Sequence, residues 1–524
     1  MPLRAKDVRG IRRNVRIFDL RDEQAVVRLL RHLGFPNLAR SHPLRSVFGI
    51  ALESNCRWVV AEPYISTDYS DEFAGCYSRV FRPIPRLCTR LHFFSKSVKH
   101  LTFLTLLEMP DVVKVEHYIG YSVIRPIPVF QTGDTVLKSP YCSDDGSDLI
   151  HCQAEFEVHL FGEELRVRGM PFIQQETNVG VCAQADLWMV ARYMNRLGET
   201  RRYRPSELTR LAAPYSTLNS IREGLTDEQM LEALRQMGLN PVMIYPQNAS
   251  EAREVLYAYA ESELPVIVGL PQHVAVVIGH DYAPNMVRHS PPRGEVVTLA
   301  AYVNAFFVHD DAEGPYIRRT IGRGEIPVGR SRQEVVTLDG VPVEYCMAIV
   351  PPRVLLRPED VIEMGRIWVA RIRKWILALP RVKKETVWPK EDLQNLVFRP
   401  YLRRSDRFKT EIMEFARREK VDAAIAVRYC CAPMPKYIWV LELSKVDEVR
   451  NRSPHRRLVR GEILLDSTAN RHSVDDALLA FHLNGRIYWR SRNEPTREYF
   501  FDGPFSSEPR PPLLRPVKRE HQAS

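Results

Sequence analysis

Several common site motifs are missing from this 524-residue sequence. It contains no phosphate-binding GxxxxGK[ST] loop, no GxGxxG after a strand, no zinc-hydrolase HExxH and no serine-hydrolase GxSxG. Its nine cysteines are scattered and include no CxxC pair, which argues against a zinc site or a disulfide framework and favours reduced thiols. The usual nucleotide, metal and serine chemistries are therefore excluded in their simple forms.

Long apolar runs are also missing. The N-terminus has no apolar signal-peptide core, and the longest apolar run, residues 265–279, is interrupted by Pro271, Gln272 and His273. The composition is that of a globular protein, with 45% hydrophobic and 9% aromatic residues. We therefore expect no membrane association and a cytoplasmic location.

The charge is only mildly one-sided, with a formal net charge of +10. The excess is concentrated near both ends, at residues 9–16 and 510–519, and no stripe of Arg and Lys interleaves with aromatic residues. Nucleic-acid binding is therefore not favoured. Salt-sensitive binding through the basic termini stays open as a minor alternative.

The length predicts two to four domains. We expect a flexible basic N-terminus at 1–15, an N-terminal α+β accessory domain at 16–165, a central domain at 166–352, a C-terminal α/β accessory domain at 353–503, and a disordered tail at 504–524. In the N-terminal domain the patterns predict a helix at 19–34, capped by Asp19, and strands at 57–66, 112–130 and 154–162. In the C-terminal domain they predict a helix from Pro358, strands at 423–429, 437–443 and 460–466, and a helix at 473–483.

The central block has the clearest pattern. A helix from Cys182 carries an apolar stripe and ends at Gly198; the stripe consists of Ala183, Leu187, Val190 and Met194. A second helix over 226–238 begins with a capping box of Thr226 and Gln229. Strand-like runs follow at 241–246, 264–270, 273–282 and 304–310. Helices followed by strands favour an α+β fold with a sheet packed on a helical layer.

A thiol, an imidazole and a carboxylate occur in an order that suits nucleophilic catalysis. Cys182 stands at a helix start, where the helix dipole lowers the pKa of a thiol. His273 opens a strand, and Asp310 and Asp311 end a later one, where a carboxylate could orient the imidazole. Because strand neighbours point to opposite faces, only one aspartate can do so, and we favour Asp310 by its position.

Two further positions bear on this site. Gln175, seven residues before Cys182, could donate an amide N–H to a developing oxyanion together with the backbone N–H of Cys182. Gln174 is the alternative donor. His280 is a rival to His273 as the base, and strict alternation over seven residues places it on the opposite face of the strand.

The order Gln, Cys at a helix start, His at a strand start and Asp after a later strand resembles the papain-like cysteine peptidases, in particular the bacterial type that processes bacteriocins and double-glycine leaders. The stretches that carry the resemblance lie within residues 170–320: QETNVGVCAQADLWMV, PVIVGLPQHVAVVIGHDY and VHDDAEGPY.

This resemblance implies a papain-like core, in which a nucleophile helix in a helical layer packs on an antiparallel sheet, flanked by N- and C-terminal α/β regions. It also implies a thiol hydrolase with a Cys182–His273–Asp310 triad and Gln175 at the oxyanion. The substrate would be a polypeptide, cleaved at a peptide or isopeptide bond through an acyl-enzyme. No metal or organic cofactor is implied.

Alternatives stay open. The same thiol could serve acyl transfer, deamidation or transglutamination. Ala183 and Gln184 stand where the family usually has Gly-Pro, and Asp186 lies one helical turn from Cys182, which favours a catalytically inactive, peptidase-like binding protein. The accessory regions are long enough to recognise a dedicated partner protein. No residue predicts the oligomeric state.

Overall fold

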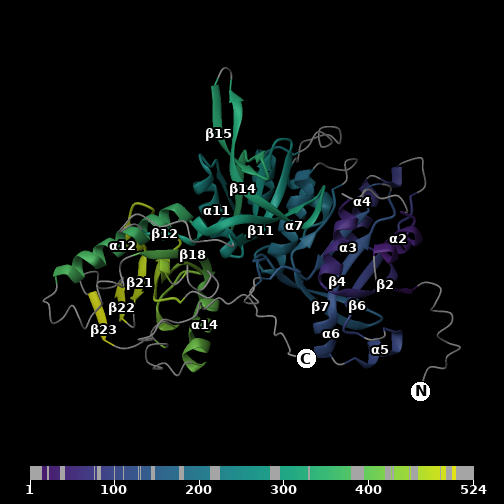
Figure 1. The fold of residues 1–524 in the computed structure, drawn as a ribbon, viewed down its shortest axis with the longest axis horizontal. Coiled ribbons are helices and arrows are strands. Elements are labelled where there is room, and N and C mark those ends of the chain that lie inside the picture. Colours follow the sequence, from purple (N-terminus) through teal and green to yellow (C-terminus); the bar gives the residue numbers. More distant parts are fainter. Residues whose placement is uncertain are drawn as a thin grey trace.

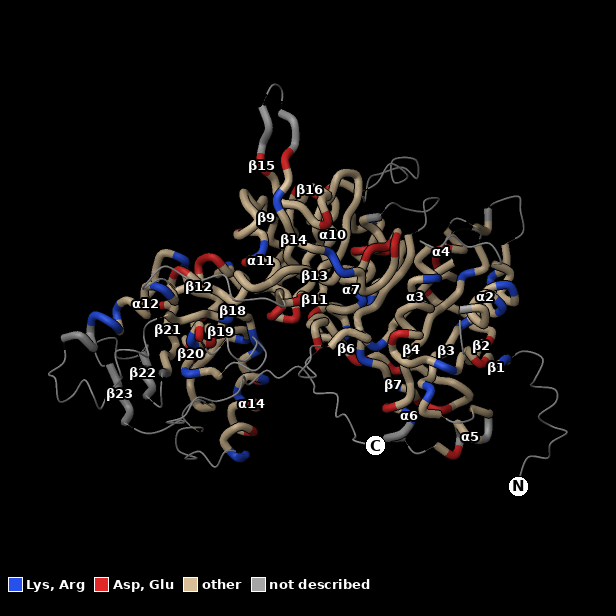
Figure 2. Tube along the Cα trace, viewed as in Figure 1, with Lys and Arg blue, Asp and Glu red and all other residues tan. Residues whose placement is uncertain are grey.

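The computed structural model forms three sheet-containing regions that lie along the longest axis (Figure 1). It describes residues 15–20, 23–35, 42–75, 77–79, 84–98, 101–109, 111–127, 129, 131–142, 148–175, 182–212, 225–283, 296–328, 331–378, 395–418, 427, 430–447, 449, 458–483, 486–490 and 498–502. Acidic and basic residues are interspersed along all three regions (Figure 2). The mixed helix-and-sheet composition that the sequence predicted is confirmed.

The N-terminal region is built on a six-stranded antiparallel sheet, ordered β1-β2-β3-β4-β5-β8. Its strands are β1 (Arg16–Asp19), β2 (Cys56–Tyr64), β3 (Cys88–Ser95), β4 (Tyr118–Ile124), β5 (Thr132–Leu137) and β8 (Pro171–Phe172). Its helices are α2 (Glu23–His32), α3 (Pro43–Glu53), α4 (Thr67–Gly75), η1 (Tyr77–Arg79), α5 (Phe103–Glu108) and α6 (Asp111–His117). A separate hairpin of β6 (Ala154–Leu160) and β7 (Glu163–Gly169) alternates buried and exposed residues, as a half-buried ribbon does.

The central region contains an eight-stranded antiparallel sheet, ordered β16-β15-β14-β13-β11-β10-β17-β9. Its strands are β9 (Asn240–Ile244), β10 (Val266–Leu270), β11 (His273–Tyr282), β13 (Val303–Asp310), β14 (Gly314–Val328), β15 (Ser331–Leu338), β16 (Val341–Pro342) and β17 (Tyr345–Val350). Its helices are α7 (Cys182–Arg196), α8 (Pro205–Ala212), α10 (Asp227–Gln236), α11 (Ala249–Glu261) and η3 (Leu299–Tyr302). The hairpin of β14 and β15 projects away from the rest of the sheet (Figure 1).

The C-terminal region holds a seven-stranded sheet, ordered β12-β18-β19-β20-β21-β22-β23. Its strands are β12 (Val297–Thr298), β18 (Leu396–Arg404), β19 (Tyr437–Lys445), β20 (Gly461–Asp466), β21 (Leu478–Leu483), β22 (Arg486–Arg490) and β23 (Glu498–Asp502), and its helices are α12 (Pro358–Ala378), α14 (Ser405–Arg418) and α17 (Val474–Ala477). Only the β12–β18 pair is parallel among the described strands. Both flanking regions are therefore α+β. This agrees with the class predicted for residues 16–165 and corrects the α/β class predicted for the C-terminal domain, because its neighbouring strands, β12 and β18 excepted, run antiparallel without βαβ crossovers.

The predictions for the central helices are confirmed. α7 begins at Cys182, and the side chains of its predicted apolar stripe are at most 4% exposed. Gly198, just past its end, has a φ of 77°, the left-handed conformation that commonly ends a helix. The capping box of Thr226 and Gln229 is present at the start of α10. These local patterns depend on neighbouring residues only, which is why the sequence alone reveals them.

Three local predictions were wrong. Asp19 is not a helix cap but the last residue of β1, where it binds Arg57 at 3.0 Å, and α2 begins later, at Glu23. The strand predicted over 112–130 starts as helix α6. The helix predicted over 473–483 covers only α17, because from Leu478 onward the chain pairs with β20. In the first and third cases, pairing with a distant segment overrides a local preference. The strand predicted at 423–429 lies almost entirely outside the described residues, as do the two predicted termini.

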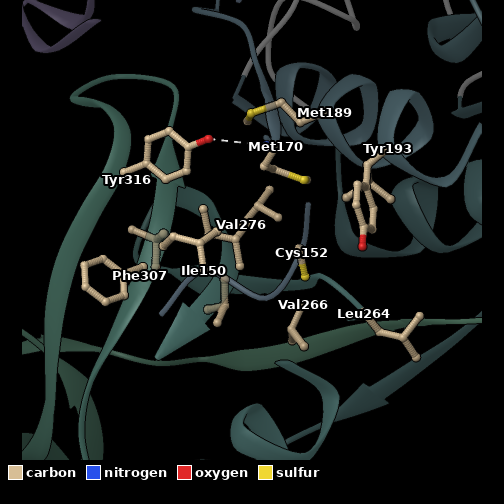
Figure 3. Packing of buried hydrophobic residues seen from close by; sticks show 14 of the residues in the cluster. Ile150, Cys152, Met170, Met189, Tyr193, Leu264, Val266, Val276, Phe307 and Tyr316 are labelled. Carbon is tan, nitrogen blue, oxygen red and sulfur yellow. Dashed lines mark hydrogen bonds between the residues drawn. The ribbon is translucent and has the colours of Figure 1, made fainter. Parts of the chain in front are cut away.

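The central sheet incorporates a segment from before the predicted domain boundary. Ile150 forms a bridge with Gly279 of β11, and the backbone N–H groups of His151 and Cys152 both donate to the carbonyl of Ile278. Ile150 and Cys152 lie between α7 and the sheet, among Met189, Tyr193, Val276 and Phe307 (Figure 3). The predicted boundary at 165/166 falls inside β7, and β8 still pairs with β5. The N-terminal and central regions therefore share one core.

The C-terminal region is joined to the central one through buried charges. Arg399 of β18 donates from Nε to Glu261 Oε2 at 2.8 Å and from Nη1 to Glu442 Oε2 at 3.1 Å. All three side chains are at most 7% exposed. Burial alone raises the pKa of Glu261, but Arg399, His151 and His280 together outweigh it and hold that pKa well below its usual range. The carboxylate therefore remains ionised beside its guanidinium partner.

Among the helices of the described residues, none combines the length and the apolar character needed to cross a bilayer.

The bridge at Gly279 predicts a stability effect. A Cβ on Gly279 would lie 2.3 Å from the carbonyl oxygen of Leu149, a backbone atom that cannot swing away. We expect Gly279→Ala to lower the free energy of unfolding by about 1–3 kcal/mol, because the pairing of residues 149–152 must shift. Chemical denaturation measures this change.

Gly49→Ala is the matched control, since Gly49 lies within α3 and a Cβ there would meet nothing within 4 Å. That variant should be more stable by up to about 1 kcal/mol, because alanine favours helix. Equal stability of Gly279→Ala and the parent protein would contradict the described pairing.

Candidate active site

Helix α7 packs as the sequence predicted, but the thiol of Cys182 lies outside the described part of the structure. Cys182 is the first residue of α7, and nothing is described of its side chain or of residues 176–181. Two residues on, Gln184 Nε2 donates to Thr209 Oγ1 of α8 at 2.6 Å. Asp186 is fully buried. Gln184 therefore ties α7 to α8, and Asp186 is withdrawn from solvent.

His273 is placed by a tight turn at the edge of the central sheet. It pairs with Leu270, so that Pro271 and Gln272 alone reverse the chain between β10 and β11. Proline fixes its own φ, and Gln272 adopts a φ of 59°, which permits reversal within two residues. The side chain of His273 is 23% exposed, so one side of the imidazole stays accessible.

Asp310 is the hydrogen-bond partner of this imidazole. It is the last residue of β13, the strand next to β11, and His273 Nε2 lies 3.1 Å from Asp310 Oδ1. The same oxygen accepts the backbone N–H groups of Ala312 at 3.0 Å and Glu313 at 3.2 Å, and Arg319 Nη2 is 3.4 Å from Oδ2. These donors fix the orientation of the carboxylate.

The electrostatics keep Asp310 ionised. Burial alone raises the pKa of this carboxyl, but the hydrogen bond and charge of His273, the backbone N–H of Ala312 and the charge of Arg319 outweigh it, so the pKa lies below its usual range. At neutral pH the carboxylate can therefore hold the imidazole in one tautomer and stabilise its charged form.

Asp311 lies close to the same imidazole in a different environment. Its Oδ1 is 3.9 Å from His273 Nε2, beyond hydrogen-bond range, and its side chain is fully buried. Within the described residues, neither of its carboxylate oxygens has a hydrogen-bond partner. Burial raises the pKa of Asp311 to about 7, with the charge of Asp310 adding to the rise and that of His273 opposing it. The pKa of Asp311 is thus raised, whereas that of the adjacent Asp310 is lowered.

Gln174 and Gln175, the two glutamines before α7, differ in their burial. Gln174 accepts the backbone N–H of Thr132 at its Oε1, at 3.1 Å, and its Nε2 lies 3.3 Å from the carbonyl of Val129. Its amide is therefore bound to the edge of the N-terminal sheet. Gln175 is the next residue and is partly exposed.

His280 lies away from His273, but not because the two side chains point to opposite faces of β11, as the sequence predicted. The register of β11 shifts by one residue in mid-strand. Val277 pairs with Val308 and His280 with Phe306, two residues on one face of β13, so alternation from Val277 puts His273 on that face too. The predicted opposite faces are therefore wrong, because a β-bulge cancels the odd spacing. The two histidines are still roughly 20 Å apart along the strand.

Among the described residues, two groups of side chains have ligand atoms close enough together to be tested as metal sites, His151–Glu261–His280 and His273–Asp310–Asp311. In the first, the imidazole rings stack with centroids 4.6 Å apart and an interplanar angle of 25°, so their in-plane lone pairs do not converge on one point. Arg399 also occupies the carboxylate of Glu261. In the second group, Oδ1 of Asp310 already accepts hydrogen bonds from the backbone N–H groups of Ala312 and Glu313. Both groups fit ion-pair chemistry better than metal binding.

The N-terminal region supports the strand that ends in Asp310. Gly314, four residues on, has a φ of 139°, and a Cβ there would lie 2.3 Å from Ser46 Oγ of α3. His309, next to Asp310, is fully buried and its Nδ1 lies 3.2 Å from the carbonyl of Pro171. The turn that orients the carboxylate is therefore packed against another region of the chain.

The sequence prediction missed part of this site. Arg319 reaches Asp310 from the neighbouring strand β14, and only the strand register shows this. The N–H donors of Ala312 and Glu313 did have a signal, since an aspartate followed within four residues by glycine is typical of turns in which the side chain binds the backbone.

No protein-family model and no curated protein matches the sequence. Over about a third of its length the chain is similar to solved structures. The peptidase domain of Streptococcus ComA, a bi-functional ABC transporter, is 16% identical with a TM-score of 0.20, covering 34% of this chain and 95% of that chain. A double glycine motif protease from an AMS/PCAT transporter, in complex with the leader peptide, is 18% identical with a TM-score of 0.20, covering 34% and 91%. UfSP from C. elegans is 13% identical with a TM-score of 0.22, covering 35% and 34%. These values do not establish a family for the chain.

The lowered pKa of Asp310 predicts a pH-dependent contribution to stability. Because its pKa is lower in the folded state, the contribution is fully present above the unfolded value of about 4 and disappears as pH falls through the folded value. We expect Asp310→Asn to lower the free energy of unfolding at pH 7 by about 1.5–3 kcal/mol, since it loses hydrogen bonds to a charged group. The difference from the parent protein should narrow below pH 4.

Urea denaturation between pH 3 and pH 7 measures this difference. Asp475→Asn is the control, because Asp475 forms an exposed ion pair with Arg371 that contributes little. A constant difference between Asp310→Asn and the parent across the range would contradict the ionised, hydrogen-bonded state of Asp310.

Proposed function

We propose that this protein is a papain-like cysteine hydrolase that cleaves a peptide or isopeptide bond through an acyl-enzyme. The observation that carries the proposal is the His273–Asp310 hydrogen bond at the edge of the central sheet. It orders an imidazole and a buried carboxylate as a thiol nucleophile requires, in a chain whose packed helix α7 begins at a cysteine.

The proposed mechanism gives the two nitrogens of His273 different roles. Because Nε2 is bound to Asp310, Nδ1 is the nitrogen that takes the thiol proton of Cys182. The thiolate then attacks the substrate carbonyl, and the imidazolium returns the proton to the leaving amine. Water, deprotonated by Nδ1, releases the acyl group and restores the thiol. Ionised Asp310 stabilises the imidazolium in both halves of the cycle.

The oxyanion is assigned to Gln175 and the backbone N–H of Cys182. Gln174 is supported less well, because its amide is already bound to Thr132 and Val129. The backbone N–H groups in the first turn of a helix have no intrahelical acceptor, so that of Cys182 suits a developing negative charge.

Four of the other described cysteines are buried and suit packing rather than catalysis. Cys56, Cys88 and Cys346 are buried, and burial raises the pKa of each thiol to about 12. Cys152 is fully buried and its thiol pKa is raised further still. Cys431 is exposed. A thiolate that forms well below the usual pKa of a thiol would therefore come from Cys182, through its proposed pairing with His273.

This contrast predicts selective alkylation. At pH 6, iodoacetamide should modify Cys182 at least tenfold faster than exposed Cys431, because only a thiolate paired with an imidazolium is abundant there. Mass-spectrometric peptide mapping over time measures both rates in one sample. His273→Ala should reduce the Cys182 rate to that of Cys431. Equal rates in the parent protein would contradict the proposal and favour a non-enzymatic binding protein.

The reaction itself is tested on a peptide library prepared from a cell lysate. Incubation with the parent protein should create new peptide termini, each cut adding one water, and Cys182→Ala should create none. Cys152→Ala is the control, because that thiol is buried and should be dispensable for turnover. Joined peptides would indicate acyl transfer instead, and a gain of about one dalton without cleavage would indicate deamidation.

A further inference from the structure

We propose that Asp311 is a second positioning residue of this site, whose own ionisation controls the charge of His273. The proposal rests on the proposed function for its catalytic consequence, but the interaction between Asp311 and His273 can be measured without turnover.

The geometry gives one imidazole two carboxyl groups. Asp310 occupies the hydrogen bond to Nε2 at 3.1 Å, and Asp311 Oδ1 lies 3.9 Å from the same nitrogen. Oδ1 of Asp310 accepts two backbone N–H groups besides, whereas within the described residues no hydrogen bond reaches either oxygen of Asp311. Asp311 is also fully buried. A buried carboxyl without donors would be costly unless it is neutral or faces a cation.

The charged groups around Asp311 come from three elements. His273 opens β11, Asp310 ends β13, and Arg319 lies on β14, where it binds Asp310, Asp339 and Glu313 of the intervening turn. Within the described residues, His273 is the one cationic group in ion-pair range of Asp311. Arg319 is already shared among three carboxylates. The charge of Asp311 is therefore coupled mainly to His273 and Asp310.

Two charge states follow. Burial raises the pKa of Asp311 to about 7, so below this pH the group is neutral and Asp310 alone faces the imidazole. Above it, Asp311 carries a second negative charge 3.9 Å from Nε2, which favours the imidazolium form of His273. The second negative charge therefore raises the pH at which the imidazolium of His273 loses its proton. The thiolate of Cys182, which pairs with that imidazolium in the proposed mechanism, persists to the same higher pH.

Asp311→Asn removes this charge with little change in shape. The midpoint of the His273 imidazole titration should move to lower pH by about one unit or more, and the alkaline limb of kcat/KM should move with it. Histidine-selective ¹³C labelling gives the titration, and the His273 signal is the one missing from His273→Ala.

Glu313→Gln is the matched control, because it removes a half-exposed carboxylate from the same turn. It should move the midpoint of His273 by no more than a few tenths of a unit. An unchanged midpoint in Asp311→Asn, or equal shifts in both variants, would overturn the proposal.

The parent protein provides a test that does not depend on the variant folding. Its His273 signal should titrate in two steps, one of them near pH 7 from the ionisation of Asp311, and a single step would count against the proposal. Failure of this inference and failure of the proposed function are distinguishable. Slow alkylation of Cys182 with a two-step His273 titration would reject only the hydrolase. Fast alkylation with a one-step titration would reject only the role of Asp311.

Discussion

The structure depends on the pairing of one strand, β11, on both of its edges. β13 follows it on one side, and on the other β10 pairs as far as Val277 before residues 149–152 take over. The first edge brings Asp310 to His273. At the second edge, residues 149–152 pair with β11 where its pairing with β10 ends. The candidate site and the core shared by the N-terminal and central regions therefore both result from the strand pairing of β11.

Buried charge extends this connection to the third region. Glu261, at the end of α11, lies 3.0 Å from His280 on β11 and also binds Arg399 on β18. A complete buried ion pair adds little to the free energy of unfolding. Removing one partner is strongly destabilising, because it leaves an uncompensated charge in the interior. The arrangement therefore selects one relative position of α11 and the C-terminal sheet more than it adds stability. The strand that begins with His273 is held at its far end by the same carboxylate.

The sequence predicted the features that depend on neighbouring residues. The apolar stripe of α7, the capping box of α10 and the strands β9, β10, β11 and β13 follow from patterns among neighbouring residues, whereas β14 to β17 were not predicted. It could not predict the bulge in β11, because a bulge is a property of two strands and not of one. For the same reason it missed Arg319, the bridge at Gly279 and the strand pairing of residues 478–483. The roles of Cys182, His273, Asp310 and Gln175 remain proposals.

The bridge between Ile150 and Gly279 also has a consequence for how the chain acquires its structure. The partners are 129 residues apart in sequence (279 − 150), and closing so long a loop costs entropy before any contact compensates for it. During synthesis residues 149–152 must therefore stay unpaired until β11 has emerged from the ribosome. We expect slow maturation and a transient need for chaperones, a kinetic cost of building one core from distant segments.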